Sequence, residues 1–255
     1  MKNIGQSSVM AKHPFLKFCV KEYRKRVSRN LFDRAKGVVV RGGFSGMRLN
    51  KKVHWGKGDL AAKIYGLYEP EILQVISASS LQYLVNLGAG DGYYPIGMLI
   101  HKKVEHAFCF EENPKGRKLI LENSKENNVQ DDITLFGRAE AGFHRSLPAE
   151  VLNGRTLVLC DIEGGEFDVF TPEVVSAFKN STFIIELHDW KFENRNEKRE
   201  ALLRQFDGFN VRVLKSKPKQ WAGICEIEEL SENDRALVCS EGRKILGEWI
   251  VCDSK

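Results

Sequence analysis

Three glycines spaced two residues apart, Gly88, Gly90 and Gly92, directly follow the apolar run 81–87. Glycine after a strand lets the backbone turn sharply and approach a ligand closely, so this segment is a candidate ligand-binding loop. A dinucleotide-binding loop of the form G-x-G-x-x-G needs its third glycine at position 93, where this chain has Tyr93. Because a bulky ring there would block a pyrophosphate, a nicotinamide cofactor is not favoured. Alternatively, the three glycines form only a tight structural turn and bind no ligand.

A carboxylate ends the next apolar run. Glu111 follows residues 107–110, about twenty residues past the glycines, where an acid accepts hydrogen bonds from ribose hydroxyl groups. A carboxylate in that place tolerates a free diol and repels a ribose phosphate. Glu112 beside it leaves the assignment ambiguous by one residue, and a solvated acid at a strand end is the structural alternative. The glycines and the acid together favour a ligand that contains adenosine.

Two other apolar runs end in polar residues that could react. Asp161 follows residues 156–160, and Glu186 and His188 lie at the end of residues 183–187. Side chains alternate between the faces of a strand, so Glu186 and His188 are predicted to point the same way. Together with Asp161 they could place His188 as a general base, or hold a divalent metal such as Mg²⁺ or Mn²⁺. Hydrogen bonding that only fixes loops is the structural alternative.

The runs that carry these residues alternate with segments of helical pattern. Asn113-Pro114 and Thr171-Pro172 each combine an N-capping side chain with a first-turn proline, which is typical of helix starts. Continuous apolar strands alternating with helices predict an α/β fold, with a doubly wound, mostly parallel sheet and helices on both faces. Ligands of such sheets bind beyond the carboxyl ends of the strands. Strands are expected at residues 81–87, 107–110, 133–136, 156–160, 183–187, 211–214 and 249–251, and a helix at residues 61–77.

The charges are distributed unevenly along the chain. Residues 1–58 contain fifteen Lys or Arg and two acidic residues, whereas the other 197 residues contain 24 basic and 32 acidic ones. Apolar residues recur at helical spacing among these basic residues, which predicts a basic amphipathic helix: Phe15, Leu16, Cys19, Tyr23 and Val27. We therefore divide the chain into a basic N-terminal arm, 1–58, and a ligand-binding domain, 59–255. The helix either docks its apolar stripe on the domain or contacts an anionic membrane surface, an acidic glycan or RNA.

Composition excludes several classes of protein. With 255 residues, of which 42% are apolar, the chain fits one large domain with an extension, and it is neither collagen-like nor disordered. No apolar run approaches the roughly 20 residues that span a bilayer, and the first residues do not resemble a signal peptide. Six cysteines are scattered without a Cys-x-x-Cys pair. Free thiols in a reducing cytoplasm are therefore favoured over a disulfide framework or a zinc site.

Three segments, taken in order, resemble the class I S-adenosylmethionine-dependent methyltransferases, and most of all the FkbM family: NLGAGDGYY at 86–94, FEENP at 110–114 and DIEGGE at 161–166. The resemblance spans residues 68–189 and implies a Rossmann-like fold. This chain differs from the family at Asn86, where these enzymes usually have an acidic residue. Carried over by matching positions, it implies a cofactor site of Asn86, Gly88, Ala89, Gly90, Asp91, Tyr93, Glu111, Ala139, Glu140 and Asp161.

The resemblance also implies an activity. It points to an enzyme that moves the methyl group of S-adenosylmethionine to a hydroxyl group, with a sugar or glycan as the favoured acceptor. Transfer would be an in-line displacement, in which alignment supplies much of the rate. Asp161, Glu186 and His188 would be the catalytic residues, as general base or metal site. Glu163 and Glu166 are expected to fix the following helix rather than to react.

Two other functions stay open. The basic arm could serve an RNA ribose methyltransferase, or the domain could bind cofactor or a partner without catalysis. None of the seven prolines is followed by Pro or Cys, so the usual signatures of base-amine and cytosine methylation are absent, and nucleic acid is not favoured. Glu111 and Asp161 argue against an inactive domain. A cytoplasmic enzyme, at most peripheral to a membrane, is expected, and the oligomeric state cannot be inferred.

Overall fold

The structure is a computed structural model that describes residues 13–52, 59–217, 219–239 and 245–255. Within them the strands form one seven-stranded sheet of order β3-β2-β1-β4-β5-β7-β6. The first five strands in that order are parallel, and β7 pairs antiparallel with both β5 and β6. The predicted doubly wound, mostly parallel α/β fold is confirmed. The strands are β1 Tyr83–Leu87, β2 His106–Phe110, β3 Ile133–Phe136, β4 Thr156–Cys160, β5 Thr182–Glu186, β6 Phe209–Lys215 and β7 Glu248–Ser254.

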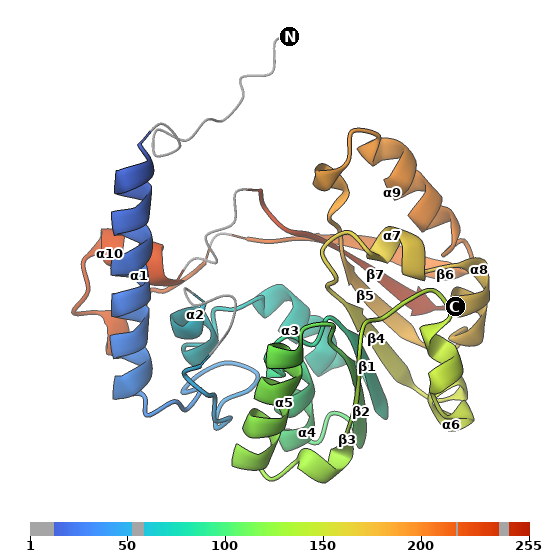
Figure 1. Cartoon of the computed structure of the whole chain (residues 1–255), viewed down its shortest axis with the longest axis horizontal. Helices are drawn as coiled ribbons and strands as arrows, with labels where there is room; N and C mark the ends of the chain where they lie inside the picture. Colours follow the sequence, from blue (N-terminus) through green and yellow to red (C-terminus); the bar gives the residue numbers. More distant parts are fainter. Residues whose placement is uncertain (1–12, 53–58, 218, 240–244) are drawn as a thin grey trace.

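Helices cover both faces of the sheet (Figure 1). Because side chains alternate along a strand, Leu84 and Leu157 pack into one buried cluster and Val85 and Val158 into the other. The first cluster includes side chains of α3 and α4, and the second includes those of α6, α8 and α9. The helices are α1 Pro14–Arg34, α2 Leu60–Ile64, α3 Pro70–Ala78, α4 Tyr93–Ile100, α5 Pro114–Glu126, α6 Ala149–Asn153, α7 Glu166–Val169, α8 Pro172–Ala177, α9 Arg195–Arg204 and α10 Glu232–Cys239.

Local sequence explains where several helices begin and end. The side chain of Asn113 accepts a hydrogen bond from the backbone of Lys115 at the start of α5, and Thr171 caps α8 in the same way. The single helix expected at residues 61–77 is wrong, because α2 ends at Ile64 and α3 begins at Pro70. The break includes Gly66 at φ +67°, where a Cβ atom would lie 2.6 Å from a backbone oxygen of Arg41. The contact comes from another part of the chain, but the break itself has local signals, because Gly66 and Pro70 both interrupt a helical pattern and Pro70 begins α3.

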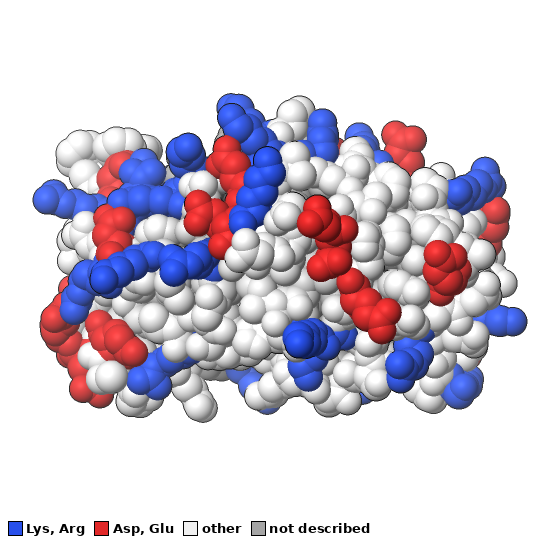
Figure 2. All heavy atoms as spheres, turned by 90° about the horizontal axis from the view of Figure 1, so that it is seen from below, with Lys and Arg blue, Asp and Glu red and all other residues white. Residues whose placement is uncertain are grey.

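Helix α1 lies at the edge of the molecule beside α2 and α10 (Figure 1). It docks through its second half, where Leu31 and Phe32 are buried and the hydroxyl of Ser28 accepts a hydrogen bond from the backbone of Ala61. Phe15 and Phe18 in its first turns are 76% and 61% exposed. The expected stripe is therefore not docked at its N-terminal end. Basic side chains crowd this end of the molecule more than the opposite end in the view of Figure 2.

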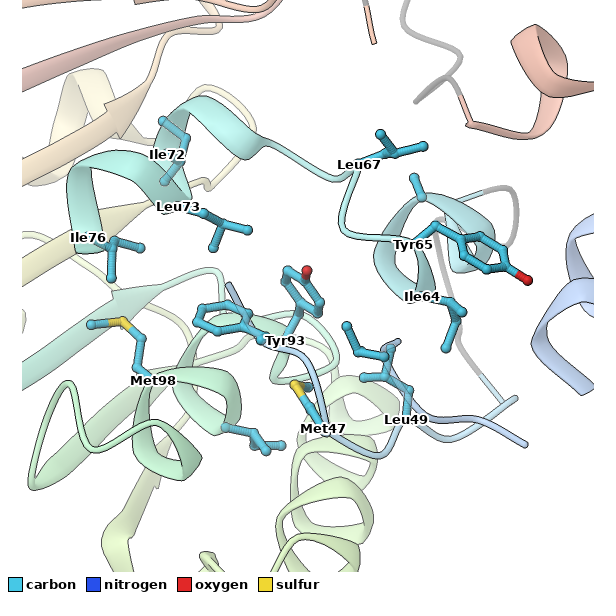
Figure 3. Close-up of a cluster of buried hydrophobic side chains, with 14 of the residues drawn as sticks. Met47, Leu49, Ile64, Tyr65, Leu67, Ile72, Leu73, Ile76, Tyr93 and Met98 are labelled. Atoms are coloured by element: carbon cyan, nitrogen blue, oxygen red, sulfur yellow. The ribbon is translucent and has the colours of Figure 1, made fainter. Parts of the chain in front are cut away.

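The segment after α1 belongs to the main core. Val39, Phe44 and Met47 are at most 2% exposed, and they share a buried cluster with Tyr93 and Met98 of α4 (Figure 3). The rings of Phe44 and Tyr93 meet edge to face with centroids 5.2 Å apart. Residues on both sides of the proposed division at 58 therefore pack into one core. None of the helices in the described parts of the chain has the length and apolar character needed to cross a bilayer.

Candidate active site

Two cavities lie at the carboxyl ends of the parallel strands. The first cavity has a volume of about 670 Å³, and the second has about 520 Å³. Both are lined by Gly88, Gly90, Asp161 and Glu163, so they meet at the ends of β1 and β4. This is the edge of the sheet where strand order reverses and where ligands of such folds bind.

The glycine loop, residues 88–92, separates the two cavities. Gly88, Gly90 and Gly92 have φ values of +79°, +62° and +85°, a backbone conformation that residues other than glycine rarely adopt. A Cβ atom at Gly88 would lie only 1.9 Å from the backbone oxygen of Asp161. The amides of Gly88 and Ala89 both donate to the carbonyl of Phe110 at the end of β2. Glycine is therefore required at position 88 by backbone conformation and by contact.

The first cavity contains the carboxylate expected to meet a ribose. Glu111 is 6% exposed, and its two oxygens accept hydrogen bonds from the backbone amides of Gly90, at 2.9 Å, and Asn113, at 2.8 Å. Burial raises the pKa of Glu111, and these two amides oppose the rise. Glu112 also lines the cavity, but its side chain is 69% exposed. Of the two neighbouring acids, Glu111 is therefore the one that the fold holds in place.

The remaining residues predicted to bind cofactor divide between the two cavities. Ala139 and Glu140 line the first cavity beyond the end of β3, near the stacked rings of Phe110 and Phe136, whose centroids are 4.6 Å apart. The second cavity is lined by the other predicted residues, Asn86, Ala89, Asp91 and Tyr93. Asn86 is buried, and its side-chain amide donates to the carbonyl of Leu159 at 3.2 Å.

The second cavity brings together the three residues predicted to be catalytic. The Nε2 atom of His188 lies 3.6 Å from an oxygen of Asp161 and 3.9 Å from one of Glu186. One ligand atom from each of the three side chains falls within 4.8 Å of the others. Two carboxylates and one imidazole form a donor set that suits Mg²⁺, Mn²⁺ or a similar divalent ion. The same arrangement suits a general base surrounded by acids.

A third acid, Glu166, holds the histidine. The side chain of Glu166 is fully buried. Its Oε1 atom accepts a hydrogen bond from the backbone amide of His188 at 2.7 Å and lies 3.2 Å from Nδ1 of the ring. The other oxygen accepts from the amide of Gly164 at 2.8 Å. A carboxylate at Nδ1 favours the tautomer in which Nδ1 carries the proton and Nε2 accepts one. Nε2 is the atom that faces Asp161 and Glu186.

The acidic side chains around His188 affect its pKa. Burial by itself lowers the pKa of His188, but the hydrogen bond to Glu166 and the charges of Asp161, Glu166 and Glu163 more than offset it. The net result is a pKa above the ordinary histidine value. The ring therefore holds a proton more tightly than a free imidazole does.

Three residues at this site had not been predicted to belong to it. Glu166 was expected only to fix a helix, and its contact with His188 links the start of α7 to the residues after β5, 22 positions apart in the chain. Lys63 on α2 lines the second cavity and contacts Asp91. No motif surrounds Lys63, so its place in the site depends on tertiary packing alone. Trp190, 48% exposed, also lines the second cavity beside His188.

No family model matches the chain, and neither does any curated protein. Solved structures that resemble it include the precorrin-6y C5,15-methyltransferase of Geobacter metallireducens, at a TM-score of 0.48 and 14% identity, covering 82% of this chain and 94% of that one. Another is TYW2 of M. jannaschii in complex with AdoMet, at a TM-score of 0.46 and 15% identity, covering 81% and 80%. Likeness this distant identifies no substrate and no reaction for this chain.

Proposed function

We propose that this protein is an S-adenosylmethionine-dependent methyltransferase that acts on a hydroxyl group. The observation that carries the proposal is the junction of the two cavities at Gly88, Gly90 and Asp161. A nucleoside whose ribose meets Glu111 would lie in the first cavity and extend toward that junction. The group at its 5′ end would then face His188 across the second cavity.

The residues of the first cavity fit an adenosine. In its ionised form, the carboxylate of Glu111 can accept hydrogen bonds from both hydroxyls of a free ribose. Gly88 and Gly90 bring backbone rather than side chains to the ligand. Ala139 and Glu140, which line the same cavity, would contact the adenine, and Asp161, which lines both cavities, would put a negative charge near the sulfonium.

The second cavity supports transfer to oxygen. Nε2 of His188 can take the proton of an acceptor hydroxyl, while Glu166 holds the ring and Asp161 and Glu186 stabilise the imidazolium. S-Adenosylmethionine, held by Glu111 and the glycine loop, would supply an electrophilic methyl group to the acceptor oxygen. It would leave as S-adenosylhomocysteine, which keeps the electron pair of the broken carbon–sulfur bond. Alternatively Asp161, Glu186 and His188 would hold a divalent metal, which lowers the pKa of a coordinated hydroxyl.

A sugar or glycan is the acceptor that we propose. The three motifs that resemble the FkbM family support it, and so does Trp190, whose exposed ring offers a flat apolar face beside the carboxylates of the second cavity. An RNA ribose is the alternative. The acids Asp161, Glu163 and Glu186 that line the second cavity disfavour it, because they repel a phosphodiester.

The test is cofactor binding by isothermal titration calorimetry with S-adenosylhomocysteine, the demethylated product. We expect the wild-type protein to bind it, and Glu111→Ala to weaken binding roughly 10- to 100-fold, because hydrogen bonds to a charged group are lost. Glu112→Ala, which alters the exposed neighbouring acid, is the matched control and should bind like the wild type. Absence of binding to the wild-type protein, or preferential binding of NADH, would overturn the proposal.

A further inference from the structure

Large apolar side chains are exposed at the mouth of the second cavity. Trp190 and Ile245 line this cavity and are 48% and 51% exposed, and Leu246, beside Ile245, is 69% exposed. Trp190 lies shortly before α9 and Leu246 shortly before β7, so the two come from separate elements. Single apolar side chains on a surface are ordinary, but a group of them at one cavity indicates a contact surface.

The first turns of α1 carry a second group of exposed apolar side chains. Phe15, Leu16 and Phe18 are all more than half exposed. Among the described residues, ten large apolar side chains are exposed, and seven of them lie on α1 or at the mouth of the second cavity. The sequence of α1 contains seven Lys or Arg and two acidic residues, and Lys21 and Arg26 are among its exposed side chains. This helix is therefore both apolar and basic on its outside.

The two groups face the same side of the molecule. The first turns of α1, the segment before β7 and the turn that leads into α9 all lie toward the upper side of the view in Figure 1, whereas α5 lies toward the lower side. Arg24 of α1 pairs at 3.2 Å with Asp59, which lines the second cavity, so the helix and the cavity are tied together. We call the six side chains of the two groups the apolar rim: Phe15, Leu16, Phe18, Trp190, Ile245 and Leu246.

The charges near the apolar rim favour a membrane as its partner. Apolar side chains can enter the acyl boundary of a bilayer while neighbouring lysines and arginines meet anionic headgroups. RNA is disfavoured, because Asp161 and Glu186 line the cavity behind the rim and would repel a phosphodiester. For the same reason the cavity would exclude the phosphate of an ordinary phospholipid and admit a headgroup that carries only hydroxyl groups.

We propose that the apolar rim rests on an anionic membrane surface, so that the mouth of the second cavity opens toward the lipid headgroups. This contact does not depend on the proposed function. Where the acceptor comes from does rest on it: the acceptor is then the sugar headgroup of a glycolipid, which enters the second cavity from the membrane and brings a hydroxyl to His188.

The test of the contact is flotation with vesicles of phosphatidylserine and phosphatidylcholine at low salt. We expect Leu246→Ser to weaken binding roughly 3- to 10-fold, because an apolar side chain that enters the bilayer is lost. Leu121→Ser is the matched control: Leu121 is 46% exposed on α5, away from the rim, and binding should change less than twofold. Unchanged binding of Leu246→Ser, an equal loss in both variants, or tighter binding of single-stranded RNA than of the vesicles would overturn the proposal.

A second measurement locates the mouth of the cavity itself. Vesicles that contain brominated phosphatidylcholine quench tryptophans that reach the bilayer. We expect them to quench the fluorescence of the wild-type protein at least about twofold more than that of Trp190→Phe, because Trp190 is at the mouth. Equal quenching of the two proteins would mean that α1 alone meets the membrane, and would overturn the proposed orientation of the cavity.

The source of the acceptor is tested with S-adenosylmethionine labelled on its methyl group and an extract of the cells that make the protein. We expect the label to enter the chloroform-soluble fraction, which holds the glycolipids. Label found only in water-soluble glycans would overturn the glycolipid acceptor. No label in either fraction, with binding to vesicles intact, would overturn the proposed function and the glycolipid acceptor and leave the membrane contact standing.

Discussion

The crevice formed by the two cavities and the first turns of helix α1 bury opposite kinds of side chain: charged side chains are buried in the crevice, and apolar ones are exposed on the helix. In the crevice, charged side chains such as Glu111 and Glu166 are buried and each accepts two or more hydrogen bonds. On the first turns of α1, aromatic side chains such as Phe15 and Phe18 are exposed instead. The crevice is built on parallel strands, whereas the first turns of α1 stand at the edge of the molecule (Figure 1).

The difference shows what each region can do. Buried charges keep their positions only when every partner is in place, so the crevice is suited to align a reaction and is sensitive to small changes. An exposed helix with apolar and basic side chains can contact an anionic surface without an exact arrangement of those side chains. Changes in the crevice should therefore have large, specific effects, and changes on α1 should have small, graded ones.

The largest effect is expected at the glycine loop. Gly88→Ala should destabilise the protein by at least about 4 kcal/mol, because the new methyl group collides with the backbone of Asp161 and the residue keeps a left-handed conformation. Gly137→Ala is the matched control: a Cβ there meets no atom within 4 Å, and stability should change by about 1 kcal/mol or less. Urea denaturation measures both. Equal stability of the two variants would contradict the tight contact between the loop and β4.

The next effect concerns turnover. His188→Ala and Asp161→Ala should each lower methyl transfer roughly 100- to 10,000-fold, the usual contribution of a positioned general base, and leave the affinity for S-adenosylhomocysteine nearly unchanged. Release of S-adenosylhomocysteine in the presence of sugar acceptors measures the rate. His13→Gln, at an exposed histidine before α1, should keep full activity. Wild-type rates in both crevice variants would rule out the second cavity as the acceptor site.

A smaller effect is expected from pH. Because burial raises the pKa of Glu111, this carboxyl takes up a proton at a higher pH than an ordinary glutamate does. The protonated form has lost an acceptor for the ribose, so affinity for S-adenosylhomocysteine should fall, on the order of tenfold, as pH is lowered through that pKa. In Glu111→Gln the affinity should be weaker and flat over the same range. Calorimetry at a series of pH values distinguishes the two; parallel profiles would exclude Glu111 as the titrating group.

The smallest effect belongs to α1. We propose that its first turns contact an anionic lipid surface, and a double variant, Phe15→Ser with Phe18→Ser, should reduce cosedimentation with phosphatidylserine vesicles a few-fold at low salt. Affinity for S-adenosylhomocysteine should not change, because neither residue lines the crevice. Neutral phosphatidylcholine vesicles are the control. Equal binding of the wild type to both vesicle types would count against an electrostatic contact.

Much of the crevice could be predicted because its residues are tied to local pattern. Gly88, Glu111 and Asp161 each follow an apolar run, and parallel strands bring the ends of such runs to one edge of the sheet. Alternation also placed Glu186 and His188 in the same cavity. These inferences needed only the sequence of each strand and the residue after it.

The rest depends on contacts between distant parts of the chain. Lys63 enters the second cavity because α2 packs there, and Glu166 meets His188 across two loops. The insertion of β7 between β5 and β6 is set by pairing that no single strand determines. Contacts with α2 and α10 likewise determine which part of α1 is buried. The apolar spacing along α1 therefore did not indicate that Phe15 would be exposed.

The most direct measurement is a crystal structure of the protein soaked with S-adenosylhomocysteine. It should have the ribose hydroxyls at Glu111 and the sulfur near Asp161, where the two cavities meet. An empty crevice at saturating ligand, or a nicotinamide dinucleotide bound there instead, would contradict the account.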